Sequence, residues 1–336
     1  MLWYAIASLT PAALLAFACL WGGVFPPAAV LSITVVVFFA DKLTRQLPVS
    51  EADGRAVSLT LAAVHFPLLA LGIWALAAGP HLGVLDKVLI FTGLGLFFGQ
   101  ISNSNAHELI HAQARPLRRL GALIYTSVLH GHHVSGHLRV HHVHAATDAD
   151  PNSARAGEGF WAYCARAVRG EFIAGLRAEN AQRARAASRS ALSHPYIGYV
   201  LGGLGFLALS YGFAGLKGVL IHIGIAAYAQ LQLLLSDYVQ HYGLRRRMQP
   251  NGKPEPVGPA HSWNAPKWYS AAMMLNAPRH SDHHMRPATA FPALALDART
   301  MPMLPHSLPV MAVVALIPPL WRRVMDQRVA RWQNPA

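Results

Sequence analysis

The chain has 336 residues, of which 53% are hydrophobic and only 13% are charged. Soluble domains carry about 25% charged residues, so the low charge indicates an integral membrane protein that crosses the bilayer several times. The net charge of +13 does not point to a nucleic acid partner, because Lys and Arg concentrate between the apolar segments, as in cytoplasmic loops. The two cysteines, Cys19 and Cys164, have no CxxC spacing, which excludes a rubredoxin-like or ferredoxin-like iron centre within this chain.

Six apolar segments are candidate membrane spans, since about 20 apolar residues are needed to cross roughly 30 Å of hydrocarbon. They lie at about 2–21, 25–41, 56–78, 85–105, 195–213 and 215–238. Short Gly- or Pro-containing turns join the first two segments and the last two, and leave no room there for another domain. The sequence therefore predicts one all-α membrane-embedded domain, 1–336, with six transmembrane helices.

The distribution of positive charge predicts the orientation of these helices. Segment 42–55 carries Lys42, Arg45 and Arg55, whereas segment 79–84 carries no Lys or Arg. The positive-inside rule then places 42–55 in the cytoplasm, and the fourth span returns to the same side. Regions 105–194 and 239–336 are consequently expected to form a cytoplasmic cap. Within them, 120–130 is expected to be a packed or interfacial helix, and 151–192 one or two amphipathic helices.

The late apolar run at 308–320 is too short for a seventh span. It is closed by Pro318 and Pro319 and followed by Trp321, Arg322 and Arg323. Trp and Arg favour the membrane–water interface, so this segment is expected to be an interfacial helix.

Histidines recur at metal-ligand spacing in three parts of the expected cap. His107 and His111 are four residues apart, as are His137 and His141. Because such residues project from the same face of a helix, each pair is expected to serve one metal. Further candidate ligands follow at His142, His241, His280, His283 and His284. Hydropathy and charge alone place all nine on the same side of the membrane, so we expect them to share one metal site.

The number of histidines argues against a simple zinc hydrolase. An HExxH motif by itself is typical of such an enzyme, with Glu108 as its general base. That site needs only three protein ligands and one open position, whereas nine histidines suit two metals with four or five nitrogens each. Imidazole binds iron, copper and zinc alike, so ligand type does not identify the metal.

Other polar residues near the boxes are expected to support the ligands. The additional histidines around the second box are expected to act mainly as neighbours or proton-relay groups rather than as ligands: His130, His132, His133 and His144. Ligand imidazoles usually donate their second N–H to a carboxylate or carbonyl. The acids available for this role are Glu108, Asp150, Glu158, Asp237 and Asp282.

In combination, these motifs resemble those of the membrane alkane 1-monooxygenases. That family belongs, with xylene monooxygenase, to the integral-membrane fatty-acid desaturase and hydroxylase superfamily. The shared motifs are HELIH at 107–111, HLRVHH at 137–142, DPNS at 150–153 with GE at 157–158, HYGL at 241–244 and RHSDHH at 279–284. They occur in matching order from about the second span to about residue 290. The resemblance implies a six-span bundle with a cytoplasmic histidine cap in the bacterial inner membrane.

The resemblance also implies an activity. The nine histidines would hold two non-haem iron ions, and that centre, with no separate side-chain catalyst, would use O2 to hydroxylate the terminal methyl group of a medium- or long-chain alkane to a primary alcohol. An apolar channel between the spans would admit the substrate from membrane lipid. Its candidate lining residues lie near the inner ends of the second and fourth spans: Phe38, Phe39, Phe97 and Phe98.

The electrons for this reaction need a separate donor, because the chain has no flavin, Rossmann or iron–sulfur motif. In the family the donor is rubredoxin with its NAD(P)H-dependent reductase, or a ferredoxin-type reductase in the xylene branch. Rubredoxins are acidic, so Arg115, Arg118 and Arg119 are candidates for steering the donor to the cytoplasmic face.

Several alternatives remain open at this stage. Asp237 and Gln240 stand where alkane hydroxylases usually have Asn and Glu, and the chain looks shorter than those enzymes. One alternative substrate is therefore an alkylbenzene methyl group, as in xylene monooxygenase. A fatty-acid desaturase or hydroxylase of the same superfamily is a second alternative. From another class come a metal transporter, which should place ionisable ligands near the middle of its spans, and a zinc intramembrane protease, which should not need His280 or His284.

Overall fold

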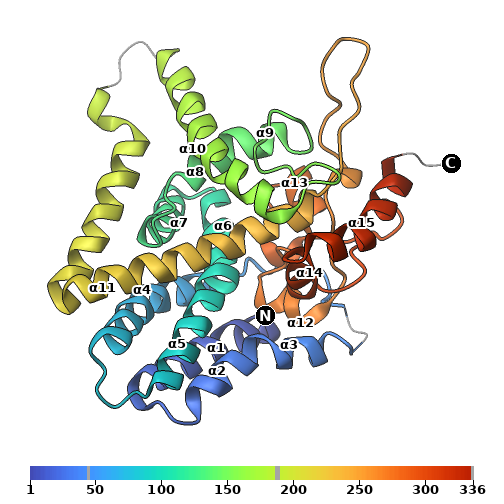
Figure 1. Ribbon diagram of the computed structural model, residues 1–336. Helices are drawn as coiled ribbons and strands as arrows, with labels where there is room; N and C mark the ends of the chain where they lie inside the picture. Colours follow the sequence, from blue (N-terminus) through green and yellow to red (C-terminus); the bar gives the residue numbers. More distant parts are fainter. Residues whose placement is uncertain (44–45, 186–189, 334–336) are drawn as a thin grey trace.

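The computed structural model describes residues 1–43, 46–185 and 190–333, and the regular elements in these ranges are all helices. This confirms the all-α class. In Figure 1 the apolar helices fill the lower half of the molecule and the histidine-bearing segments lie above them. The lower helices are α1 (Leu2–Trp21), α2 (Phe25–Ile33), α3 (Val35–Ala40), α4 (Arg55–Ala78) and α5 (Val84–Leu96).

Four helices in the described part of the chain are long and apolar enough to cross a membrane, which makes the chain a multi-pass membrane protein. They are Leu2–Trp21, Arg55–Ala78, Val84–His111 and Pro195–His241. The expected span at 25–41 is instead the shorter apolar stretch Phe25–Ala40, in which α2 and α3 are separated at Thr34. At 1.5 Å per residue this stretch is about 24 Å long, less than the roughly 30 Å of hydrocarbon. The six-span count is therefore not confirmed.

The last two expected spans form one helix with a sharp bend. Helix α11 (Pro195–His241) is interrupted at Gly215, whose φ of 60° and ψ of −161° are not helical. Glycine adopts a positive φ without the steric cost that a Cβ would add. Figure 1 shows the two arms of α11 meeting at an angle on the left of the molecule. The second arm crosses the molecule and ends at His241.

The fourth span continues into the cap as expected. Helices α5, η1 (Phe97–Ser102) and α6 (Asn103–His111) form one run from Val84 to His111. Its central element η1 is a π-helix, a wider turn that is found most often at functional sites. The run carries His107 and His111 beyond its apolar part.

The cap consists of shorter helices around the ends of these two long ones. The expected packed helix is α7 (Arg115–Ser127), and the expected amphipathic region contains one long helix, α10 (Phe160–Ala184). Between and after them come α8 (His133–Gly136), η2 (His137–His141), α9 (His142–His144), η3 (Ala191–Ser193), η4 (Pro259–His261), α12 (Trp268–Met273), α13 (His280–Met285), η5 (Phe291–Ala293), α14 (Leu308–Ala315) and α15 (Pro318–Gln333).

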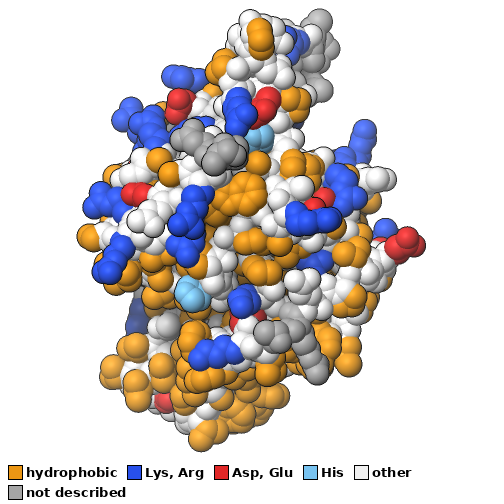
Figure 2. All heavy atoms as spheres, turned by 90° about the vertical axis from the view of Figure 1, so that its right-hand side faces the viewer, with side chains coloured by type: hydrophobic (Ala, Val, Ile, Leu, Met, Phe, Trp, Pro, Cys, Tyr) orange, Lys and Arg blue, Asp and Glu red, His pale blue; other side chains and the backbone are white. Residues whose placement is uncertain are grey.

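The C-terminal helices do not match the interfacial helix expected at 308–320. The indole of Trp321 is fully buried and packs on Tyr238 and Tyr242, with ring centroids 5.2 Å away in both cases. Trp321 therefore joins α15 to α11 within the protein. Figure 2 shows the face that includes this region: hydrophobic side chains dominate its lower part, and Lys and Arg gather over its middle and upper parts.

Candidate metal centre

The structure brings the nine predicted histidines together in two groups, each with its candidate ligand atoms within 4.8 Å of one another. The five-histidine group consists of His107, His111, His137, His142 and His283. The four-histidine group consists of His141, His241, His280 and His284. The two groups are adjacent, because the rings of His142 and His284 have centroids only 4.7 Å apart.

The assignment of the second histidine box differs from expectation. His137 and His141 were expected to serve one metal, but His137 belongs to the five-histidine group and His141 to the four-histidine group. The reason is local: residues 137–141 form the π-helix η2, in which the hydrogen-bonded repeat is five residues instead of four. His137 therefore pairs with His142, five residues on, and their Nε2 atoms lie 2.9 Å apart.

Helix α13 connects the two groups. His280 and His284 are one helical turn apart and both face the four-histidine group, whereas His283 faces the five-histidine group. The Nε2 atom of His280 lies 2.9 Å from that of His241 and 3.1 Å from that of His284. A single short helix thus supplies ligands to both sides of the centre.

The distances between these nitrogens fit a bound metal better than they fit hydrogen bonds alone. The Nε2 atom of His137 lies 3.0 Å from that of His111 as well as 2.9 Å from that of His142. One nitrogen with a single hydrogen or lone pair cannot hydrogen-bond well to both. Metal–nitrogen bonds of about 2.1 Å at right angles would place neighbouring nitrogens about 3.0 Å apart. The residues present therefore fit a metal ion in each group.

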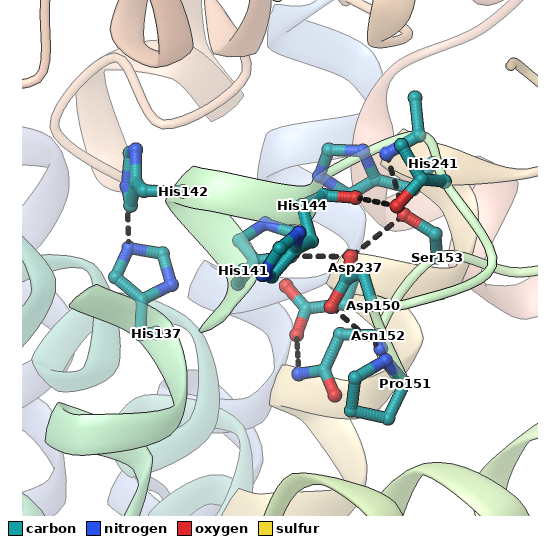
Figure 3. A network of polar contacts seen from close by, with 12 residues as sticks. His137, His141, His142, His144, Asp150, Pro151, Asn152, Ser153, Asp237 and His241 are labelled. Atoms are coloured by element: carbon teal, nitrogen blue, oxygen red, sulfur yellow. Dashed lines mark hydrogen bonds and ion pairs between the residues drawn. The ribbon is translucent and has the colours of Figure 1, made fainter. Parts of the chain in front are cut away.

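A hydrogen-bond network orients His141 in the four-histidine group (Figure 3). Its Nδ1 lies 2.8 Å from Oδ2 of Asp150, while its buried Nε2 has no hydrogen-bond partner within the protein. Asp150 also accepts from the hydroxyl of Ser153 and the backbone N–H of Asn152. The Asn152 side chain then donates to Asp237 at 2.9 Å. This network leaves Nε2 of His141 close to the ligand atoms of His241, His280 and His284, where it can bind a metal.

The charges around these imidazoles favour metal binding. Burial, followed by the neighbouring imidazoles, holds the pKa of His280, His283 and His284 well below the ordinary value, so all three are neutral at pH 7 with a lone pair to offer. His141 behaves differently. Its burial is outweighed by the charge and hydrogen bond of Asp150, which raise the pKa of His141 to about 9. This makes it a more basic ligand, and a metal that binds at pH 7 displaces a proton from its imidazole.

Of the five predicted supporting acids, Asp150 is the one that contacts a candidate ligand within the described residues. Asp237 reaches His141 only through Asn152 and Asp150. Glu158 pairs with Arg166, Asp282 pairs with Arg286, and Glu108 accepts a backbone hydrogen bond from Phe291 at 3.3 Å. The last three instead tie loops and helices of the cap together.

Sequence reasoning missed a third polar cluster beside the five-histidine group. It contains His130, His133 and Glu171, and its candidate ligand atoms also lie within 4.8 Å of one another. Glu171 comes from α10, in the segment that was expected only to form amphipathic helices. A signal was present: the buried face of α10 repeats every four residues at Tyr163, Ala167, Glu171, Gly175 and Glu179.

An apolar cavity of about 740 Å³ is lined by residues of α2, α3, α5, α11 and α14. Phe38 and Phe39 line it, as predicted for a substrate channel, but Phe97 and Phe98 do not. Those two are fully buried, and Phe98 packs on His65 with ring centroids 5.0 Å apart. The cavity's polar lining residues include Asn103 and Ser104, on the turn before His107.

The three arginines proposed for donor docking lie next to the end of α6. Arg115 and Arg119 are exposed. Arg118 is partly exposed and donates to the backbone carbonyl groups of Ala112 and Gln113, where α6 has ended. Arg118 therefore has structural partners, whereas Arg115 and Arg119 have no side-chain hydrogen bond or ion pair among the described residues.

Comparison with known proteins places these observations in a family. A model of the fatty acid desaturase family matches residues 85–314. Alkane 1-monooxygenase 2 of Pseudomonas aeruginosa is 31% identical over 289 residues, which cover 84% of this chain and 76% of that protein. Alkane 1-monooxygenase 1 of the same organism is 32% identical over 294 residues, 84% of this chain and 75% of that protein. Alkane 1-monooxygenase 2 of Alcanivorax borkumensis is 32% identical over 248 residues, 74% of this chain but only 65% of that protein.

Proposed function

Because the chain belongs to the fatty acid desaturase family and aligns with alkane 1-monooxygenases over most of its length, we propose that it hydroxylates the terminal methyl group of an alkane. It is an oxidoreductase of the alkane hydroxylase type. The single observation that carries the metal assignment is the convergence of nine histidines into groups of five and four. We assign these nine as ligands of two iron ions.

The bound irons would supply the activation of O2 and the removal of hydrogen from the methyl group. The protein's own residues hold and orient them. Asp150 keeps Nε2 of His141 directed at its metal by binding Nδ1, and Ser153 and Asn152 in turn keep the Asp150 carboxylate in place. Such partners of metal-bound histidines set ring orientation and raise ligand basicity.

The apolar cavity supports an alkyl substrate. Most of its wall is hydrophobic, including Val30, Ile33, Leu96, Leu235 and Val313, so it would accept a chain without polar groups and exclude water from it. Its position against the last turn before His107 would bring the end of such a chain toward the histidines. We therefore assign the cavity as the substrate-binding site, with Phe38 and Phe39 in its wall.

The proposal includes six membrane crossings and a metal centre on the cytoplasmic side of the bacterial inner membrane. The two arms of α11 count as separate crossings, and Phe25–Ala40 as a short one. The exposed Arg115 and Arg119, with Arg118, would meet an acidic electron donor on that side. Rubredoxin with its NAD(P)H-dependent reductase is the donor we propose, because the described residues include no other redox group.

The experiment is to measure metal content and product together in detergent-purified protein, comparing wild type with His283→Ala and His241→Ala. We expect iron in the wild type, less iron in both variants with the larger loss in His241→Ala, and conversion of an n-alkane to the primary alcohol by the wild type alone. His144→Ala is the control, since His144 directly follows the second histidine box but belongs to neither histidine group, and it should retain both iron and activity.

Two outcomes would contradict the proposal. One is a zinc ion that is indifferent to both substitutions, which would favour a hydrolase. The other is an iron protein that converts an alkylbenzene or forms an alkene from an acyl chain while leaving n-alkanes unchanged. A substrate panel containing all three classes distinguishes these results.

A further inference from the structure

We propose that His130, His133 and Glu171 bind a third metal ion, a first-row divalent cation, separate from the nine histidines. Two imidazoles and one carboxylate are a ligand set that both zinc and non-haem iron(II) use, with coordination positions left open for a small molecule. The set is drawn from the segment before the second histidine box and from α10, and α10 contributes no residue to the other two groups.

The three side chains are arranged around the Glu171 carboxylate. Its Oε1 lies 2.6 Å from Nδ1 of His133, and its Oε2 lies 3.5 Å from Nε2 of His130. The second distance is too long for a good hydrogen bond, and Oε2 is buried without a hydrogen-bond partner among the residues that the structure describes. A cation between His130 and Glu171 would satisfy this oxygen.

The Glu171 carboxylate is buried, so its negative charge has to be compensated within the protein. The side chain of Glu171 is only 2% exposed, and those of His130 and His133 are also buried. In the ranges that the structure describes, no Lys or Arg forms an ion pair with Glu171; its ion pairs are with the two histidines alone. A buried carboxylate is unfavourable unless its charge is compensated, and here the compensation must come from a proton on one of the two imidazoles or from a bound cation. A divalent ion held by all three groups would supply the missing charge.

The surrounding backbone leaves space for this carboxylate. A Cβ added at Gly136 would lie 2.6 Å from Cγ and 2.8 Å from Oε1 of Glu171, so any larger residue there would displace the carboxylate. A cavity of about 10 Å³ adjoins His130 and Tyr125, room for about one water-sized ligand. The ring of His133 stacks on that of His137 at 5.2 Å. The third ion would therefore fasten α10 to the segment that carries the second histidine box.

The test is a count of all first-row metals per chain in the detergent-purified full-length protein. We expect about three ions in the wild type and about two in Glu171→Gln, with the iron that depends on His283 retained. Glu179→Gln is the matched control, because Glu179 is also buried on α10 but contacts Arg139 and Ser135, and it should keep all three. When the third metal is added back to metal-depleted protein, the melting temperature of the wild type should rise and that of Glu171→Gln should not change.

Two metal ions per chain in the wild type, and the same number in Glu171→Gln, would overturn the third site. If Glu171→Gln fails to fold, two ions in the wild type alone would overturn it. Gly136→Ala provides an independent variant that should lose the same ion without changing a ligand. The outcome is separable from that of the proposed function: metal loss in His283→Ala with a Glu171-dependent ion retained would support the third site, whatever substrate the enzyme oxidises.

Discussion

The five-histidine group and the four-histidine group differ in how deeply their side chains are buried and in whether a carboxylate orients them. All four side chains of the four-histidine group are buried, and one of them is oriented by Asp150. In the five-histidine group His107, His111 and His142 are partly exposed, and no described carboxylate hydrogen-bonds to any of its members. The four-histidine group therefore depends on ligands that burial and Asp150 hold in position, whereas the five-histidine group has weaker support from its surroundings and one more ligand.

The largest expected effect comes from removing one ligand on each side. His241→Ala would leave three histidines in the four-histidine group, whereas His111→Ala would leave four in the other, still a common coordination number. We expect His241→Ala to lose more of its metal than His111→Ala and at least about 100-fold of the hydroxylation rate, a larger loss than a supporting residue causes. His111→Ala should retain part of its metal. Elemental analysis and product formation would measure both, and the reverse order would contradict the comparison.

A smaller effect is expected from the carboxylate that distinguishes the two groups. Asp150→Asn preserves the shape of the side chain but removes the negative charge that makes His141 basic. The metal affinity of the four-histidine group should therefore fall about 10–100-fold. The five-histidine group should be unaffected. Chelator titration of the purified protein would resolve the two classes of metal. Two classes that weaken equally would show that Asp150 does not act through His141.

A third prediction separates metal binding from substrate binding. Phe38 lines the apolar cavity, so Phe38→Ala should shift the preferred alkane length, with up to about a tenfold change in KM, because a buried CH2 group contributes about 0.8 kcal/mol. Metal content and stability should not change. Phe98→Ala is the matched control: it should lower the free energy of unfolding by roughly 3–5 kcal/mol without altering chain-length preference. A panel of n-alkanes and thermal unfolding would check both, and an unaltered preference in Phe38→Ala would rule out the assignment of this wall.

The smallest effect is expected at Glu158, which pairs with Arg166 instead of a histidine. Partial burial opposes ionisation, but Arg166 outweighs it and lowers the pKa of Glu158. The pair therefore stabilises the fold above the ordinary glutamate pKa of about 4.3, and the contribution disappears as the pH falls through the lower folded-state value. Glu158→Gln should cost about 0.5–1 kcal/mol at pH 7 and no metal. Loss of metal would instead give Glu158 the supporting role first predicted for it.

The large features of the fold followed from patterns that are local in the sequence. The lengths of the apolar runs indicated membrane helices, and the unbroken run before His107 indicated a helix that continues into the cap. Its observed course from Val84 to His111 agrees with this. The run at 25–41 is not confirmed as a span, because its apolar composition resembles that of a span while Phe25–Ala40 is shorter than the other four membrane helices and is interrupted at Thr34.

The residue types and spacing of the histidine boxes were sufficient to single out the nine histidines, since few other functions place so many imidazoles on one side of a membrane. Their division between two groups was decided only in three dimensions. It depends on the π-helical repeat at 137–141 and on which face of α13 meets each neighbour. Likewise, only tertiary packing buried Glu171 beside two histidines and rotated Phe98 away from the cavity that Phe38 lines, because those positions depend on contacts between segments far apart in the chain.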